Sequence, residues 1–263
     1  SMQRDGYNTD LSDADWEVIA PFLEAGPRRG PKQKYATREI VNAIYYVITT
    51  GVQWRNVPKD FPPYRIVYWH FMKWRDKEAF KNLHTHLRKQ LRVRLGRNED
   101  PSAGIIDSQT VKSTIHGESI GYDGNKKTKC RKRHLLVDTL GLIIVLVIHS
   151  AAIVDCTASE KVLNHVDVPD RLELAWVDKG YRGKRVQDFG AANGIRVEVV
   201  GNPNPTSFAV AHKRWLVERT NAWMFGARRL TKDHERTIAS SEAHIYARFS
   251  KLMAGWIQRG SIS

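Results

Sequence analysis

Three acidic residues occupy positions from which they could bind metal ions. Asp107 ends one short apolar run that favours a strand, Asp178 ends another, and Glu218 lies in a stretch with helical spacing. Acidic residues at the carboxyl ends of strands in an open sheet face the crevice where such sheets bind ligands. If the two strands are neighbours, both aspartates reach one point, and a helix beside that edge can add the glutamate.

Carboxylates gathered in this way select hard divalent cations. Mg²⁺ binds a few carboxylates and keeps water and phosphate oxygens at its remaining positions. Two such ions about 4 Å apart can activate an attacking oxygen and stabilise a leaving one in phosphodiester cleavage. Each acid also has a plainer interpretation. A strand-end aspartate often caps a turn, and Glu218 can pair with Arg214, four residues earlier, on a solvated helix face.

Other acids and several histidines are weaker candidates for this site. The acids among them are better explained as turn residues, because short acidic side chains accept hydrogen bonds from their own backbone. Structural hydrogen bonds explain the histidines, because a metal-activated water needs no histidine base. These weaker candidates are Asp138, Asp155, His116, His134 and His149.

A dense basic run lies between Asp107 and the next apolar segment. Six of the nine residues at 126–134 are Lys or Arg. A charge run is usually a solvated loop, but this one adjoins the proposed site, so we expect it to bind phosphate backbones with steep salt dependence. The run comprises Lys126, Lys127, Lys129, Arg131, Lys132 and Arg133.

The composition indicates a polyanionic partner. The chain has 263 residues, 41% of them hydrophobic, and a formal net charge of +14. Nucleic acid is the usual partner of so basic a protein, and a merely basic surface is the alternative. The two cysteines lack zinc-site spacing, and the longest apolar run is too short to span a bilayer. We expect no signal peptide and no membrane segment, and therefore a cytoplasmic, nucleoid-associated protein.

The segment before the turn-rich stretch at 96–104 is predicted to be entirely helical. Apolar residues at helical spacing predict helices at 13–23, 38–50 and 64–80, and a fourth through 83–95. We therefore place a helical domain at 1–98 and a second domain at 99–263.

The third predicted helix is rich in basic and aromatic residues. This pattern indicates a helix-turn-helix-like domain that lays its second helix on DNA, with Arg65, Lys73 and Arg75 as candidate contacts. In the alternative interpretation, Trp69 and Trp74 belong to the core and the basic residues form a solvated face.

The second domain has an α/β pattern. Its predicted element order is β-β-β-α-β-α-β-α-α, in which a hairpin is followed by alternating helices and strands, so we expect a mixed sheet flanked by helices. The predicted strands are 103–107, 134–138, 142–151, 172–177 and 195–200, and the predicted helices are 159–166, 184–193, 208–228 and 240–258.

Several motifs together resemble the bacterial insertion-sequence transposases of the DDE class, in the insertion-sequence-five group. In the second domain they are DSQTVK at 107–112, VDTLGL at 137–142, DKGYRG at 178–183 and RWLVERT at 214–220. In the first domain LSDADWE at 11–17, REIVNAI at 38–44 and GVQWR at 51–55 resemble the same group. The resemblance covers nearly the whole chain.

This resemblance implies a ribonuclease-H-like fold with a five-stranded mixed sheet. It also implies that Asp107, Asp178 and Glu218 are the catalytic, metal-binding triad, with Mg²⁺ as the cofactor and Mn²⁺ as a substitute. The implied reaction cuts double-stranded DNA at terminal inverted repeats and joins the freed 3′-hydroxyl to target DNA. Two DNA ends need two active sites, so a homodimer is expected in the DNA complex.

The resemblance also suggests further DNA contacts near the glutamate. Arg182 follows Asp178 in a glycine-flanked turn, and Arg214 and Arg219 flank Glu218. The group's basic residue seven positions after the glutamate falls on a phenylalanine here, so the nearby Arg228 and Arg229 become candidates. Two other functions stay open at this point: a domesticated, non-catalytic DNA-binding protein, and a nuclease of the same fold without strand transfer.

Overall fold

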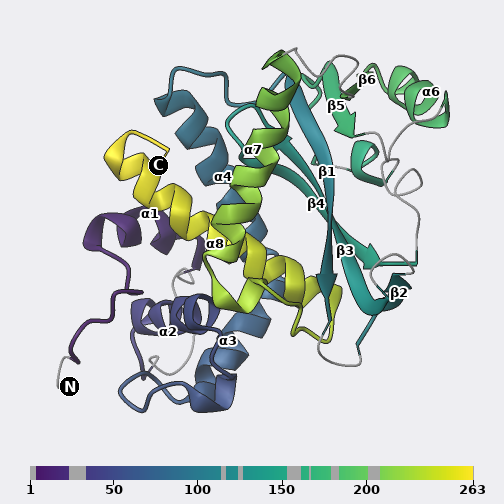
Figure 1. Cartoon of the computed structure of the whole chain (residues 1–263). Coiled ribbons are helices and arrows are strands. Elements are labelled where there is room, and N and C mark those ends of the chain that lie inside the picture. The colour runs from purple at the N-terminus through teal and green to yellow at the C-terminus, as the bar shows by residue number, and fades with distance from the viewer. Residues whose placement is uncertain are drawn as a thin grey trace. The chain divides into compact units, whose positions relative to one another are not determined.

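The chain folds into two compact units, each assembled from segments that are discontinuous in sequence. The first unit comprises residues 1–97, 224–231 and 239–263, and the second comprises 98–223 and 232–238. The computed structural model (Figure 1) describes residues 4–23, 34–113, 117–123, 127–152, 161–165, 167–178, 184–200 and 208–262, with side chains at 123, 185, 200 and 208–214 left aside.

Unit 1 is helical, as the sequence predicts. The predicted helix at 64–80 ends at Asp76 and the fourth helix begins already at Ala79, because Glu78 adopts a left-handed backbone conformation (φ 51°) that an α-helix cannot contain. Its elements are α1 (Asp13–Leu23), α2 (Thr37–Thr50), η1 (Trp54–Asn56), α3 (Tyr64–Asp76), α4 (Ala79–Arg94), η3 (Arg228–Leu230) and α8 (Ile238–Arg259).

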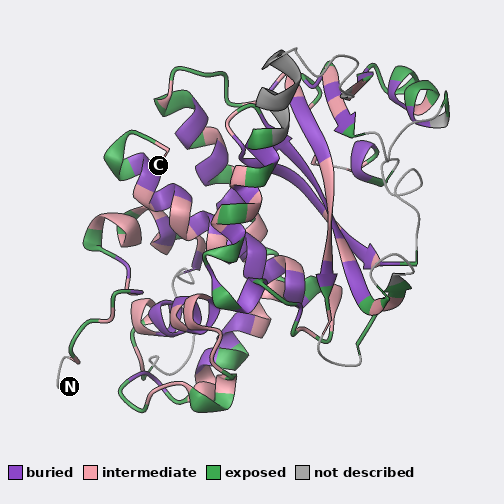
Figure 2. Ribbon diagram, viewed as in Figure 1, coloured by how far each residue is buried: buried purple, intermediate pink, exposed green. Residues whose placement is uncertain are grey.

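The core of unit 1 combines α2 with the C-terminal helix. On α2, Ile40, Ile44 and Ile48 form a fully buried stripe at helical spacing. On α8, Phe249 and Met253 are fully buried one turn apart. Figure 2 shows this burial along α2 and α8. The structure thus places α8 in unit 1, whereas the sequence assigned 99–263 to a single second domain.

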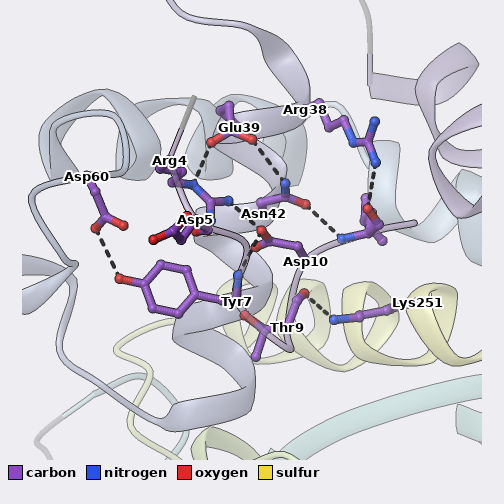
Figure 3. A network of polar contacts seen from close by, with 11 residues as sticks. Arg4, Asp5, Tyr7, Thr9, Asp10, Arg38, Glu39, Asn42, Asp60 and Lys251 are labelled. Atoms are coloured by element: carbon purple, nitrogen blue, oxygen red, sulfur yellow. Dashed lines mark hydrogen bonds and ion pairs between the residues drawn. The ribbon is translucent and has the colours of Figure 1, made fainter. Parts of the chain in front are cut away.

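The N-terminal segment is fastened to unit 1 by a polar network (Figure 3). Arg4 donates to the Glu39 carboxylate at 2.7 Å and lies 2.8 Å from Asp10. The backbone N–H of Leu11 donates to Asn42 Oδ1 at 3.0 Å. Acids and cations neutralise each other within this network, so its role is to hold the segment on α2.

Unit 2 contains the predicted mixed sheet, in which five strands lie in the order β4-β3-β1-β5-β6. β1 pairs in parallel with β5, which pairs in parallel with β6, and the pairs that β3 forms with β1 and β4 are antiparallel. A short sixth strand, β2, pairs with the start of β3 beside β4. The strands are β1 (Ala103–Lys112), β2 (Gly121–Asp123), β3 (Thr128–Asp138), β4 (Ile143–Ser150), β5 (Leu174–Asp178) and β6 (Arg196–Val200).

The turn between β3 and β4 follows the sequence prediction. The Asp138 carboxylate accepts hydrogen bonds from the backbone N–H groups of Leu140 and Leu142, at 2.8 and 2.9 Å. Gly141 has φ 76°, which a residue with a side chain rarely adopts. Asp138 is therefore a turn cap, as its position indicates.

The two faces of the sheet have different partners. On one face Ile106, Leu136 and Val177 join a core that includes Val186 of α6 (Lys184–Ala192). Helix α7 (Phe208–Phe225) lies on the other side of the sheet (Figure 1). Because side chains alternate along a strand, the neighbours of Ile106 and Val177 point away from this core.

A buried arginine ties β3 to the segment at 232–238. Arg131 is fully buried and forms an ion pair with Asp233 at 3.2 Å, and Asp233 is also fully buried. The same guanidinium donates to the backbone carbonyls of Glu118, Glu235 and Arg236. The segment is thereby held against the sheet of unit 2.

We expect the substitution Asp233→Asn to destabilise the protein strongly. Removing one partner of a buried ion pair leaves the other charge without compensation, which costs roughly 3–5 kcal/mol. The more exposed pair of Arg75 and Asp76 provides a control, since Asp76→Asn should cost less than about 1 kcal/mol. Urea denaturation followed by circular dichroism measures both, and similar small losses in the two variants would contradict the expectation.

Candidate active site

The register between β1 and β5 brings two of the predicted acids together. The parallel pairs run Ile105 with Trp176 and Ile106 with Val177, so the next residues on the two strands are Asp107 and Asp178. Adjacent strands lie about 4.8 Å apart, which places the two residues side by side. Since Ile106 and Val177 both point into the core, both aspartates point to the opposite face.

The two carboxylates differ in their surroundings. Asp107 is half-buried in the middle of β1, and its Oδ1 accepts a hydrogen bond from the backbone N–H of Ser108 at 2.8 Å. Asp178 is exposed at the last position of β5. An accessible pair of carboxylates suits a hard divalent cation, because Mg²⁺ binds one or two carboxylates and completes its shell with water or phosphate oxygens.

The third predicted acid, Glu218, lies on α7. It is exposed on α7, whereas the adjacent Leu216 and Val217 are buried. Among the described residues, which include all three acids, no group of three or more His, Cys, Asp or Glu side chains could hold a metal ion. The residues thus fit a divalent cation through the aspartate pair, and the convergence of all three acids stays a prediction.

Helix α7 is anchored to the turn between β3 and β4. Arg219 Nη2 donates to the carbonyl of Leu140 at 2.7 Å, and Thr220 Oγ1 donates to that of Gly141 at 2.7 Å. Both bonds are made from one side of the helix. They set how α7 is turned about its axis, and therefore where Glu218 points.

The basic run at 126–134, which the sequence predicts to bind phosphate, is largely part of strand β3 and not a solvated loop. Arg131 and Arg133 are both buried on this strand, so neither guanidinium is exposed on the surface of unit 2. Burial lowers the pKa of Arg133 to about 10, an effect that Asp233 partly offsets. Lys127 and Lys129 are exposed and Lys132 is half-buried, and Lys126 lies outside the described residues.

Two more predicted contacts are engaged inside unit 1. Arg229 is buried, and it donates to His244 Nε2 at 3.1 Å and to the carbonyl of Val52 at 3.3 Å. Arg75 bonds to the Asp76 carboxylate and, at 2.9 Å, to the hydroxyl of Ser240. Both guanidiniums thus make internal contacts, and their role in DNA binding stays a prediction.

The remaining predicted contacts have varied positions. Arg65 and Arg228 are exposed, and Lys73 is half-buried. Arg182 and the side chain of Arg214 lie outside the described residues. Arg219 is half-buried and bonded within unit 2.

The aromatic residues beside these cations were not proposed as site residues from sequence. Trp69 on α3 is 56% exposed, whereas Trp74 on the same helix is buried. On α7, the Arg219 guanidinium stacks against Trp215 and Trp223. The spacing of four residues in Trp215, Arg219 and Trp223 is the signal that could have revealed this stack.

The histidines of unit 2 have a structural setting. The rings of His134 and His149 stack with centroids 4.6 Å apart, and His149 Nδ1 lies 2.7 Å from the carbonyl of Ser150. His134 faces the same side of β3 as Leu136, away from Asp107. His116 lies outside the described residues.

A mixed sheet in the order β4-β3-β1-β5-β6, with an aspartate pair on its two central strands, defines the ribonuclease-H-like class of nucleic-acid-cleaving enzymes. The family model described as "Transposase DDE domain" matches residues 98–253, and the chain belongs to this family. Residues 11–84 match a second model, "Putative transposase of IS4/5 family". A search of curated proteins finds no match.

Membership in this family makes the chain a nucleic-acid-cleaving enzyme whose substrate is DNA. The chemistry of DDE transposases generally uses a divalent metal, for which the Asp107 and Asp178 carboxylates are suitable ligands. Within the described part of the chain, no helix combines the length and apolar character needed to cross a membrane.

The buried His134 should make stability depend on pH. Burial lowers the pKa of His134 to about 3, and His149 and Lys132 add repulsion. Below about pH 6.5 the unfolded chain binds a proton at this residue that the folded chain does not, so the free energy of unfolding falls as the pH falls towards 3.

Replacing His134 with Asn should remove this contribution. Between about pH 6.5 and 4.5 the wild type should lose stability faster than His134→Asn, by up to roughly 1.4 kcal/mol per pH unit. Urea denaturation of both proteins at several pH values measures the difference. Parallel stability curves would show that folding does not lower the pKa of His134, which would contradict this prediction.

Proposed function

We propose that this protein binds the terminal inverted repeats of a mobile element, cleaves DNA at the element ends and joins the 3′-hydroxyl ends to target DNA. The observation that supports the catalytic part is the register of β1 with β5, which pairs Ile106 with Val177 and makes Asp107 and Asp178 the next residues on two parallel strands. Mg²⁺ is the proposed cofactor and Mn²⁺ a substitute. Its substrate places the enzyme in the cytoplasm, at the nucleoid.

In the proposed mechanism, Asp107 and Asp178 would hold the divalent metal, and Glu218 would be a further ligand. Such ions, when bound, activate the attacking oxygen and stabilise the leaving one. Water attacks phosphorus in the cutting step and the 3′-oxygen leaves. In the joining step the freed 3′-hydroxyl attacks a target phosphodiester and loses its proton, a new P–O bond forms, and the target's own 3′-oxygen leaves as a hydroxyl. Ser108 supports the first carboxylate through its backbone hydrogen bond to Asp107 Oδ1, which fixes the direction of that side chain.

The proposed DNA-binding surface of unit 1 is the exposed face of α3. Arg65, Tyr68 and Trp69 are exposed there, and Lys73 lies over the Trp69 ring at 5.1 Å from its centroid. Since Trp74 is buried and Trp69 is not, the helix separates a core side from a side with cations and aromatic rings. That combination suits phosphate contact together with contact to bases or sugars.

Further contacts are proposed around the active site. The exposed Lys127 and Lys129 and the half-buried Lys132 are suitable for phosphate binding, and Arg228 adds an exposed cation to unit 1. Arg182 and Arg214 keep the roles that the sequence suggests. A homodimer is proposed for the DNA complex, because two element ends must be processed together.

Replacing any one of the three acids should abolish catalysis while DNA binding persists. The matched variants Asp107→Asn, Asp178→Asn and Glu218→Gln each remove metal-ligand charge, and we expect at least about 100-fold slower cleavage, which is several kcal/mol of transition-state stabilisation. The assay incubates each protein with Mg²⁺ and DNA bearing the element's ends.

The same assay separates this function from its alternatives. Cleavage without joining would identify a nuclease, and wild-type protein that binds but never cleaves would identify a non-catalytic DNA-binding protein. Equal activity of the wild type and all three variants would refute the catalytic assignment. Asp188→Asn, an exposed acid on α6, is a suitable control and should retain full activity.

Neutralising the cations of α3 should weaken DNA binding and its dependence on salt. For Arg65→Gln and for Lys73→Gln, the slope of log K against log salt should decrease by about 0.9 for each phosphate that the variant no longer neutralises. Lys81→Gln on α4, which removes a lysine paired with Glu78, should leave the slope unchanged. Fluorescence anisotropy at several salt concentrations measures the slopes, and an unchanged slope in both α3 variants would remove this helix from the DNA interface.

A further inference from the structure

A glutamine lies beside Asp107 on the same face of the sheet. Gln109 follows Asp107 by two residues on β1, and side chains two residues apart on a strand point to the same face. The Cα atoms of such residues are about 6.8 Å apart, so the two side chains can reach a common point. The register of β1 with β5 adds Asp178 to this face. Two carboxylates and one amide are therefore neighbours on the sheet.

The amide oxygen of Gln109 is buried and lacks a hydrogen-bond donor. The residue as a whole is half-buried, and its Oε1 has no hydrogen-bond partner within the described part of the chain. A buried carbonyl oxygen without a partner costs free energy, because it has given up its hydrogen bonds to water. A ligand that binds this oxygen would remove that cost.

The side chain directly across the sheet does not supply the partner. Arg133 lies opposite Gln109 on β3, where Cβ atoms of paired residues are about 5 Å apart. Burial lowers the pKa of the Arg133 guanidinium to about 10, and the carboxylates of Asp233 and Glu235 oppose this effect. The charge of Arg133 is thus balanced by acids of the segment at 232–238, and Gln109 Oε1 remains unbonded.

The chemistry of a carbonyl oxygen limits what Gln109 can bind. A DNA phosphate cannot satisfy Oε1, because both groups only accept hydrogen bonds. Hard divalent cations such as Mg²⁺ and Mn²⁺ select carbonyl oxygens together with carboxylates. A neutral amide also adds an oxygen without adding a third negative charge, so it does not increase the repulsion between Asp107 and Asp178.

We propose that Gln109 Oε1 is a further oxygen ligand of the divalent cation that Asp107 and Asp178 are proposed to hold. The inference rests on the proposed role of these two aspartates in metal binding. It gives the site a third oxygen group from within the sheet, in addition to the contribution proposed for Glu218 on α7. The residues at 107 and 109 then act together as one Asp-x-Gln element.

Mn²⁺ binding to the full chain without DNA, measured by isothermal titration calorimetry, tests this role. Gln109→Met keeps the length of the side chain and removes its oxygen, so the Mn²⁺ affinity should fall at least about 10-fold, a loss that is typical even of groups that only support a ligand. Gln109→Glu keeps an oxygen at the same reach and adds a charge, so it should bind Mn²⁺ at least as tightly as the wild type.

A spectroscopic measurement and a matched control complete the test. Pulsed electron–nuclear spectroscopy of bound Mn²⁺ should detect the side-chain carbonyl carbon of isotope-labelled glutamine in the wild type and not in Gln109→Met. Gln187→Met removes the same amide from an exposed position on α6 and should bind Mn²⁺ as the wild type does. Urea denaturation establishes that each variant is folded.

The outcomes separate the role of Gln109 from the metal site itself. If Asp107→Asn weakens Mn²⁺ binding and Gln109→Met does not, Gln109 is not a ligand and the metal site stands. If Gln109→Met lowers only the stability, Gln109 serves the fold through its neighbour Arg133, and the inference is wrong. If the affinity falls but the carbonyl signal is missing, direct ligation is refuted. If Asp107→Asn leaves Mn²⁺ binding unchanged, the proposed metal site fails, and the role of Gln109 fails with it.

Discussion

The placement of the active-site carboxylates depends on the parallel pairing of β1 with β5. The burial of Ile106 and Val177 in one core fixes this pairing, because a shift of one residue would turn an apolar side chain outward and an aspartate inward. The free energy that sets the site therefore comes from apolar burial on the far face of the sheet. The two carboxylates carry like charges and repel each other. This repulsion would move them apart if the register were free to slip.

The basic character of the chain has two different physical roles in the structure. Some cations serve the fold, as Arg131 does by joining β3 to 232–238 through Asp233 and three carbonyls. Others remain on the surface, such as Arg65 on α3. Only the surface cations attract a polyanion at contact distance. Both the surface and the buried cations add to the long-range electrostatic field of the protein.

The strands that carry Asp107 and Asp178 could be predicted from the sequence, because a short apolar run directly precedes each aspartate. It could not predict that Arg131 and Arg133 are buried, since their partners come from a segment about a hundred residues later, as the bond from Arg131 to Glu235 shows. It also could not place Glu218. The helix containing it has a weak apolar stripe, and contacts with the β3–β4 turn decide which of its sides is buried.

The membership of α8 in unit 1 has a consequence for how the protein is made. The ribosome completes every strand of unit 2 before it synthesises Phe249 and Met253, which belong to the core of unit 1. The nascent chain therefore holds the helices of unit 1 with an incomplete apolar core until the last helix emerges. The unit proposed to recognise DNA matures last, so a chain interrupted during translation carries the catalytic strands without a finished recognition unit.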